Sequence, residues 1–363
     1  MKIKILTLLL VLLGFCSFNV AAAMGKGIYL TSSTAEDTKT LDYLIKQAKS
    51  TGIDSFIVDV DAVTKLYSKN VPEISKNGIK YVARIVVFPH GANASQMKSQ
   101  AILEKRWKQI EYALSLGASA IQLDYIRYSS RGHSASSQNQ KDVYGAITYF
   151  RNKLKEKNPN VTLQADVFGT IAYKTETGIG QDVTDVAKGV DALNPMVYPS
   201  HFWPPAMHSV TPYLTVYDAI GRFKKKLDGN FPNVKVNAYL EVHNYRYRMP
   251  DEKNYKYIQA QITGARDAGA DGWYFWSAHN QYDNLFHVLK NNQVDTMKHD
   301  FRAAESPKFN KRLFNAKAKT EKVADKVAAD KVEKVVGAEA KTDKVTEKTD
   351  KVIGETDKVT GNQ

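Results

Sequence analysis

Short apolar runs alternate with longer amphipathic stretches between about residues 25 and 299. This alternation is typical of parallel β/α units. The apolar runs predict eight strands, at 27–30, 55–60, 80–88, 120–125, 162–168, 192–198, 235–240 and 272–276. The amphipathic stretches predict seven helices, at 37–50, 95–116, 138–157, 181–189, 213–228, 254–268 and 282–292, and residues 62–77 carry a weaker helical pattern.

A glycine followed by a strand ends four of the predicted helices, at Gly52, Gly78, Gly117 and Gly269. Glycine adopts the left-handed conformation after a helix at little cost. Four copies of one helix-to-strand turn, with eight strands in about 275 residues, predict an α/β fold of the (β/α)8 TIM-barrel type. A doubly wound open sheet is the alternative, but no Gly-rich phosphate loop follows the strand at 27–30.

The first residues have the pattern of a secretory signal peptide. Lys2 and Lys4 are followed by an apolar stretch at 5–13 and by small residues at 21–23. We expect cleavage after residue 23, so that 1–23 is the signal peptide, and the apolar stretch is too short to cross a bilayer comfortably. The sequence therefore predicts an exported protein, periplasmic or extracellular, without a transmembrane segment.

Cys16 is the only cysteine of the chain and lies inside the predicted signal peptide. A lipidated cysteine is the alternative at this position, although Phe15 before it is a poor residue for such processing. Without a cysteine, the mature chain has no disulfide, no cysteine-bound zinc and no cysteine nucleophile.

The composition changes near Phe314, and we divide the mature chain into a barrel domain at 24–303 and a charged tail at 304–363. Asp-Lys-Val recurs in this tail, from Asp325 to Asp357, with one Val per seven residues in the last copies. This apolar stripe is too narrow for a coiled coil, so we expect a disordered or partly helical segment. A solvated spacer and a contact with the cell envelope both remain open for it.

The chain carries a formal net charge of +13, or +11 once the two signal-peptide lysines are removed. The basic residues are scattered among acidic ones, which argues against a nucleic-acid-binding patch. An anionic envelope or extracellular polymer is a better electrostatic partner for an exported protein, and solubility alone would also explain the charge.

Polar and aromatic residues gather at the carboxyl ends of the predicted strands. In TIM barrels this end carries the active site. The candidate residues are Asp59, Arg84, Asp124, Tyr125, Arg127, Asp166, Tyr198, His201, Trp203, Glu241 and Trp276.

Carboxylates with aromatic side chains fit glycoside hydrolysis, which needs a general acid and a second carboxylate. Asp124 and Asp166 lie on adjacent strands, about 4.8 Å apart, so their carboxyl groups can reach the spacing of retaining enzymes. We predict Asp124 as nucleophile and Asp166 as acid/base, while Glu241 is an alternative acid or orients a sugar hydroxyl. No cofactor is implied.

Arg84 and Arg127 are expected to keep Asp124 ionised by charge pairing. A purely structural ion pair between Asp124 and Arg127 is the alternative. Asp59 and His201 are candidate substrate contacts. Stacking faces for sugars, or packing at the barrel rim, are the two interpretations of Tyr125, Tyr198, Trp203 and Trp276.

Metal-dependent hydrolysis is the main chemical rival, because His201, His208, His243 and His279 follow late strands. None of them has the His-Glu-x-x-His spacing of a helical zinc site, so we predict no metal. A Ser-His-Asp hydrolase is also disfavoured, because the chain contains no Gly-x-Ser-x-Gly motif.

Several segments resemble a bacterial glycoside hydrolase TIM-barrel family long classed as a domain of unknown function. The segments are Gly27–Thr31, Ala83–Phe88, Ile121–Tyr128, Ala165–Gly169, Gly178–Asp182, Asn194–His201 and Gly272–Trp276. The resemblance covers about residues 25–285 and implies a barrel that acts on polysaccharide. It marks Asp59, Arg84, Asp124, Arg127, Asp166, Tyr198 and His201.

The chain departs from this family in two places. The segment after the third strand, Phe88–Gly91, is short and lacks the family's Trp-rich insertion, and the second strand ends without the longer acidic run. These differences keep a second function class open, a non-catalytic carbohydrate-binding barrel at the cell envelope.

Overall fold

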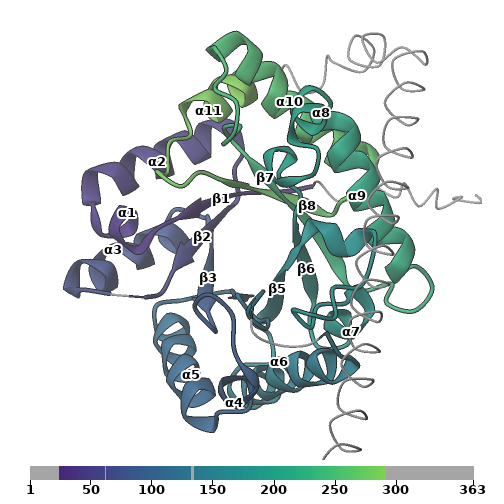
Figure 1. The fold of residues 1–363 in the computed structure, drawn as a ribbon. Helices are drawn as coiled ribbons and strands as arrows, with labels where there is room; N and C mark the ends of the chain where they lie inside the picture. Colours follow the sequence, from purple (N-terminus) through teal and green to yellow (C-terminus); the bar gives the residue numbers. More distant parts are fainter. Residues whose placement is uncertain (1–23, 62, 132–134, 292–363) are drawn as a thin grey trace, which may run out of the picture. The chain divides into compact units, whose positions relative to one another are not determined.

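The computed structural model describes residues 24–61, 63–131 and 135–291. The predicted signal peptide at 1–23 and the tail at 304–363 lie outside these residues. Eight parallel strands form one closed barrel in chain order, with helices around it (Figure 1). The strands are β1 (Gly25–Leu30), β2 (Ser55–Asp59), β3 (Lys80–Val86), β4 (Ala120–Asp124), β5 (Thr162–Phe168), β6 (Ala192–Met196), β7 (Lys235–Glu241) and β8 (Gly272–Trp276).

The predicted (β/α)8 barrel is confirmed, and the open sheet is excluded by the pairing of β1 with β8. Gly27 is paired with Tyr274 across this closure, and a Cβ at Gly27 would lie 2.5 Å from the ring of Tyr274. Glycine is therefore required where the tyrosine fills the barrel interior. The third and sixth strands end two residues before their predicted ends.

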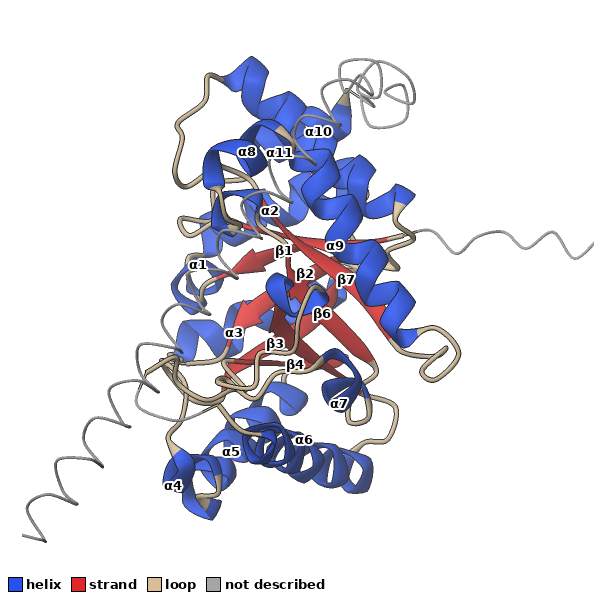
Figure 2. Ribbon diagram, turned by 45° about the vertical axis from the view of Figure 1, so that its right-hand side comes forward, coloured by secondary structure: helices blue, strands red, loops and turns tan. Residues whose placement is uncertain are grey.

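The helices lie on the outside of the strands (Figure 2). They are α1 (Ser32–Glu36), α2 (Thr38–Thr51), α3 (Lys65–Lys76), α4 (Ala94–Met97), α5 (Gln100–Ser115), α6 (Ser137–Lys157), α7 (Val183–Ala187), α8 (Pro205–Val210), α9 (Pro212–Leu227), α10 (Asp251–Asp267) and α11 (Asp283–Lys290). Two 3₁₀ turns, η1 (Gly169–Ala172) and η2 (Pro199–His201), follow β5 and β6. None of the described helices has both the length and the apolarity to cross a membrane.

The predicted helix at 95–116 is two helices. Its pattern breaks at Ser99, whose side chain accepts a hydrogen bond from Ile102 N at 3.5 Å and so begins α5. Serine competes with the helical backbone in this way and favours helix starts. The weaker helical pattern at 62–77 is confirmed as α3, while the short α1 and α8 were not predicted.

The four predicted helix-ending glycines all have left-handed backbones, with φ of 69° at Gly52, 78° at Gly78, 91° at Gly117 and 77° at Gly269. The repeated turn in the sequence was therefore a true structural signal. Two apolar cores result from the architecture, because strand residues alternate between the helices outside and the barrel interior. The inner core consists of Tyr29, Ile57, Val82, Ala120, Tyr198, Tyr239 and Tyr274.

Candidate active site

A layer of buried amides lies inside the barrel beneath the carboxylates. Gln122 precedes Asp124 by two residues and Gln164 precedes Asp166 by two, so each pair faces the same side of its strand. Asn194 on β6 donates to Gln164 Oε1 at 3.2 Å and to Asp166 Oδ1 at 3.1 Å. The layer thus fixes the Asp166 carboxyl from below.

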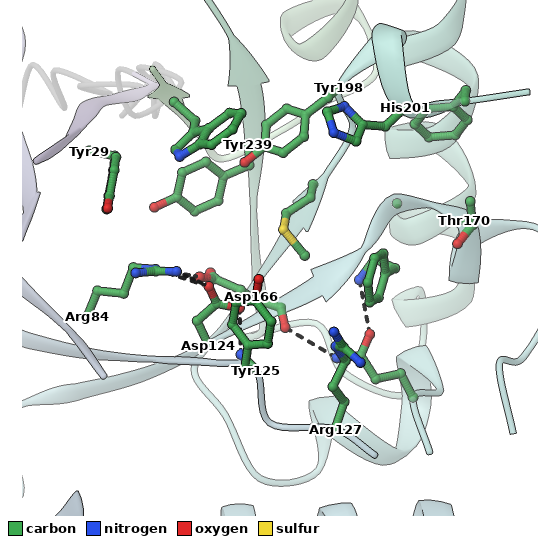
Figure 3. Close-up of a pocket in the computed structure, with 16 residues that line it drawn as sticks. Tyr29, Arg84, Asp124, Tyr125, Arg127, Asp166, Thr170, Tyr198, His201 and Tyr239 are labelled. Atoms are coloured by element: carbon green, nitrogen blue, oxygen red, sulfur yellow. Dashed lines mark hydrogen bonds and ion pairs between the residues drawn. The ribbon is translucent and has the colours of Figure 1, made fainter. Parts of the chain in front are cut away.

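Arg84 on β3 joins the carboxylates of three strands. Figure 3 shows it beside two of them, Asp124 and Asp166. Its guanidinium forms ion pairs with Asp59 on β2 and Asp124 on β4, and its Nε lies 3.9 Å from Asp166 Oδ2 on β5. Burial alone opposes the charge of Arg84, but Asp124 and Asp59 outweigh it and raise the pKa of Arg84. Arg84 therefore remains a cation and holds the neighbouring carboxylates in place.

Asp124 is the last residue of β4, and the chain turns sharply after it. Tyr125 has a positive φ of 52°, unusual for a residue with a side chain, and its N–H donates to Asp124 Oδ1 at 2.6 Å. Asp124 Oδ2 accepts from Arg84 Nε at 3.1 Å. Both carboxylate oxygens of Asp124 are therefore held by hydrogen-bond donors.

Asp166 lies in a different environment from Asp124, because burial dominates its electrostatics. It is buried on β5, and burial together with the charge of Asp124 raises the pKa of Asp166 well above its ordinary value. Asp166 therefore tends to keep its proton where Asp124 is ionised. A carboxyl group with a raised pKa beside a second carboxyl group is a pattern that acid/base catalysis uses.

The two carboxyl groups are close together. Arg84 Nε lies 3.1 Å from Asp124 Oδ2 and 3.9 Å from Asp166 Oδ2, so these two oxygens are at most about 7 Å apart. Glycosidases place their carboxyl pair roughly 5 to 9.5 Å apart. The geometry is thus compatible with attack on a glycosidic bond that lies between them.

A cavity of about 380 Å³ opens above these groups. It is lined by eight of the predicted site residues: Arg84, Asp124, Tyr125, Arg127, Asp166, Tyr198, His201 and Trp276. The rings of Tyr198 and Trp276 stack with centroids 5.4 Å apart and form an aromatic wall. Such a wall suits the apolar face of a sugar ring.

Three predicted site residues do not line this cavity. Asp59 is buried behind Arg84 and accepts a 2.5 Å hydrogen bond from Tyr29, so it supports Arg84 and does not contact substrate there. Trp203 is 78% exposed and lies outside the cavity lining. The expectation that Trp203 stacks on a sugar in this cavity is therefore not supported.

Glu241 is the third predicted site residue that does not line the cavity. Its carboxylate is fully buried and accepts hydrogen bonds from Ser200 N at 2.8 Å, from Ser200 Oγ at 2.6 Å and from Tyr257. These bonds fasten η2, the turn that carries His201 to the cavity. The geometry corrects the expectation of Glu241 as an alternative catalytic acid, because its oxygens face η2 and α10 instead of the cavity.

Arg127 is not an ion-pair partner of Asp124, contrary to the sequence-based expectation. Arg84, from a strand distant in sequence, takes that role. Arg127 instead stacks its guanidinium on Tyr125 and Phe168, with Cζ 5.1 and 5.3 Å from the ring centroids. The alternative of a structural Asp124–Arg127 pair is excluded as well.

Several cavity residues were missed from the sequence: Tyr29, Phe168, Gly169, Thr170, Gln181, Met196, Phe202 and Tyr239. Tyr29 and Tyr239 had a usable signal, because each stands on the inner face of a predicted strand. Gln181 lies in the resembling segment Gly178–Asp182, but strand periodicity could not place it, since it reaches the site through a loop and accepts from Phe168 N at 3.0 Å. Within the described part of the chain, no three His, Cys, Asp or Glu side chains are grouped to hold a metal ion.

Comparison with known proteins supports the resemblance to glycoside hydrolases. Residues 108–282 match the model of a family described as "Putative glycosyl hydrolase domain". This match covers just under half of the chain, and in that part the barrel is similar to a glycosyl hydrolase domain. The matched range includes Asp124 and Asp166, whereas the resembling segments near Gly27 and Arg84 precede it. A glycosyl hydrolase domain acts on carbohydrate, which agrees with the expected carbohydrate substrate.

Solved structures agree in fold with this glycosyl hydrolase domain. An endo-1,4-β-mannanase from Rhizomucor miehei is 10% identical with a TM-score of 0.58, and the match covers 76% of this chain and 95% of that one. The endo-β-1,4-mannanase from Thermotoga petrophila is 12% identical, with a TM-score of 0.53 and coverages of 74% and 75%. The spore cortex-lytic enzyme SleL from Bacillus cereus is 13% identical, with a TM-score of 0.54 and coverages of 73% and 73%. We found no matching protein among curated sequences.

Proposed function

We propose that this barrel is an exported glycosidase that cleaves a polysaccharide with Asp124 and Asp166. The observation that carries the proposal is the difference in surroundings between the two neighbouring carboxyl groups. Arg84 and the Tyr125 N–H donate hydrogen bonds to the two oxygens of Asp124, while burial and the nearby Asp124 raise the pKa of Asp166. One cavity therefore contains a nucleophile and a proton donor.

In the proposed reaction, Asp166 donates its proton to the glycosidic oxygen as the bond to the anomeric carbon breaks. The Asp124 carboxylate attacks that carbon and forms a glycosyl ester, and the leaving sugar departs as an alcohol. Asp166, now a carboxylate, takes a proton from water, whose oxygen displaces Asp124. The sugar leaves with its anomeric configuration retained.

Two substitutions test these roles. We expect Asp124→Asn to lower kcat/KM more than about 10³-fold on any glycan the wild type cleaves, because the nucleophile is lost. Asp166→Asn should lower it about 10² to 10⁴-fold, but much less on aryl glycosides whose leaving group needs no proton. Arg84 keeps Asp59 as a partner in both variants, so folding should persist.

The wild-type pH profile belongs to the same test. Because the acid must hold its proton, kcat/KM should fall as the pH rises through the raised pKa of Asp166. Exposed Asp228→Asn serves as the matched control and should leave the rates unchanged. Full activity of Asp124→Asn would refute the assignment. Glycan binding without turnover by both wild type and Asp124→Asn would instead identify a carbohydrate-binding barrel.

A further inference from the structure

Arg127 is a cavity cation without a carboxylate partner in the described part of the chain. Arg84 is neutralised by Asp59 and Asp124, but no described carboxylate lies within ion-pair distance of Arg127. Its one side-chain hydrogen bond in residues 24–61, 63–131 and 135–291 runs from Nη1 to the carbonyl oxygen of Tyr128, at 2.9 Å. Most of its N–H donors therefore remain available to a ligand.

Two aromatic rings hold the Arg127 side chain beside the cavity. Its Cζ lies 5.1 Å from the ring centroid of Tyr125 and 5.3 Å from that of Phe168, and Phe168 is itself 36% exposed at the cavity. Figure 3 shows Arg127 beyond Tyr125, on the side away from Arg84. Stacking on a guanidinium leaves the N–H groups at its edge free for hydrogen bonds. The group is thus oriented before any ligand arrives.

The environment favours an incoming anion. Burial lowers the pKa of Arg127, because the partly buried charge is poorly solvated. A cation in this position regains stabilisation when a negative group binds to it. The planar, forked guanidinium matches a planar carboxylate better than it matches a neutral hydroxyl.

The position of Arg127 also indicates which part of the substrate it meets. Tyr125 directly follows Asp124, and Phe168 lies two residues after Asp166, so both rings that hold Arg127 are attached to the strand ends carrying the two acids. A sugar bonded at the reacting centre therefore lies next to Arg127.

We propose that Arg127 binds a carboxylate of the substrate, so that the cavity selects glycans with a carboxyl-bearing sugar, such as a hexuronic acid, beside the cleaved bond. This inference rests on the proposed glycosidase function and names its substrate class. The formal net charge of +13, or +11 without the two lysines of the predicted signal peptide, is consistent with an anionic polymer as substrate.

The test compares oligosaccharides that differ only in charge. Oligomers of galacturonic, glucuronic and mannuronic acid are each paired with the same oligomer after reduction of its carboxyl groups to primary alcohols. Equilibrium binding to the full chain is measured by calorimetry, and the products are analysed in the same samples. We expect the wild type to bind at least one acidic oligomer about 10- to 100-fold more tightly than its reduced form, as charged hydrogen bonds allow.

Arg127→Gln should reduce this ratio to about one, and Arg127→Lys should retain part of it, because a charge remains but the fork is lost. Arg222→Gln is the control: Arg222 also stacks on a tyrosine, Tyr173, but pairs with Asp218 and does not line the cavity. It should keep the wild-type ratio.

Equal binding of the acidic and reduced forms, a ratio unchanged in Arg127→Gln, or binding of neither form would each overturn the inference. The proposed glycosidase function would be refuted by a different outcome from the one that refutes the charge selection. Arg127-dependent binding of acidic oligomers without products would refute hydrolysis alone, whereas equal cleavage of both forms would refute the charge selection alone.

Discussion

At the residue scale, Glu241 shows how a buried carboxylate can serve a site without facing it. Burial raises the pKa of Glu241 to about 7, although hydrogen bonds from Ser200 and Tyr257 act in the opposite direction. Ser200 Oγ also lies 2.9 Å from His201 Nδ1. Glu241 therefore fixes, through Ser200, the turn on which His201 reaches the cavity.

The raised pKa of Glu241 predicts that the stability of the fold depends on pH. The folded pKa of about 7 lies above the ordinary value of 4.5, so the stabilisation is fully present below about pH 4.5 and is lost as the pH rises through 7. The size is about 3 kcal/mol. The unfolding free energies of Glu241→Gln and wild type are compared by denaturant unfolding at pH 4.5 and pH 8. The difference between them should shift by about this much in favour of the variant at the higher pH. Exposed Glu156→Gln is the control, and a pH-independent difference for Glu241→Gln would contradict the argument.

At the element scale, the short connection after β3 supports the loop that carries Arg127. Ala92 N donates to the Arg127 carbonyl at 2.9 Å, and Ser129 N donates to the Ala92 carbonyl at 2.9 Å. Gly91 has a φ of 86° and lies against this loop, so that a Cβ would come within 2.6 Å of the Tyr128 carbonyl. The connection that is shorter than in the resembling family thus has a defined role here.

The substitution Gly91→Ala should therefore lower the stability of the folded protein. We expect a loss of about 2–4 kcal/mol in unfolding free energy, from the left-handed backbone and from the clash with Tyr128 and Ser129. Gly78→Ala is the matched control, because Gly78 has a φ of 78° but no atom within 4 Å of its would-be Cβ. It should lose only about 1–2 kcal/mol. Equal losses in denaturant titrations would show that the loop contact contributes nothing.

At the scale of the whole molecule, the proposed export follows from the first residues of the sequence. The positive start, the apolar stretch at 5–13 and the small residues at 21–23 remain a prediction, because they lie outside the described part of the chain. Export would bring the barrel to extracellular and envelope polysaccharides, where anionic polymers are available as substrates.

Expression of the full chain in a bacterial host tests this prediction. Mass spectrometry should find a mature protein that begins at Met24 outside the cytoplasm. Ala23→Arg should block cleavage, since the processing site requires a small residue, while Ala22→Ser keeps a small residue and should be processed normally. A cytoplasmic product that begins at Met1 would contradict the proposal.

The sequence alone determined the barrel and the positions of its two acids. Apolar periodicity and the repeated glycine turns are local signals, because they depend on the backbone conformation of a few neighbouring residues. They predicted the eight strands and placed Asp124 and Asp166 on adjacent strands. The closed pairing of β1 with β8 agrees with that prediction.

Only the tertiary structure decided which charges meet. Arg84 is 40 residues from Asp124 and Arg127 only three, yet Arg84 is the partner, because inner-facing positions on adjacent strands meet in the barrel. The same long-range geometry turned Glu241 away from the cavity and placed Phe168 against Arg127. Side-chain partners across strands depend on register and on the direction of each loop, and no short segment of the sequence encodes either.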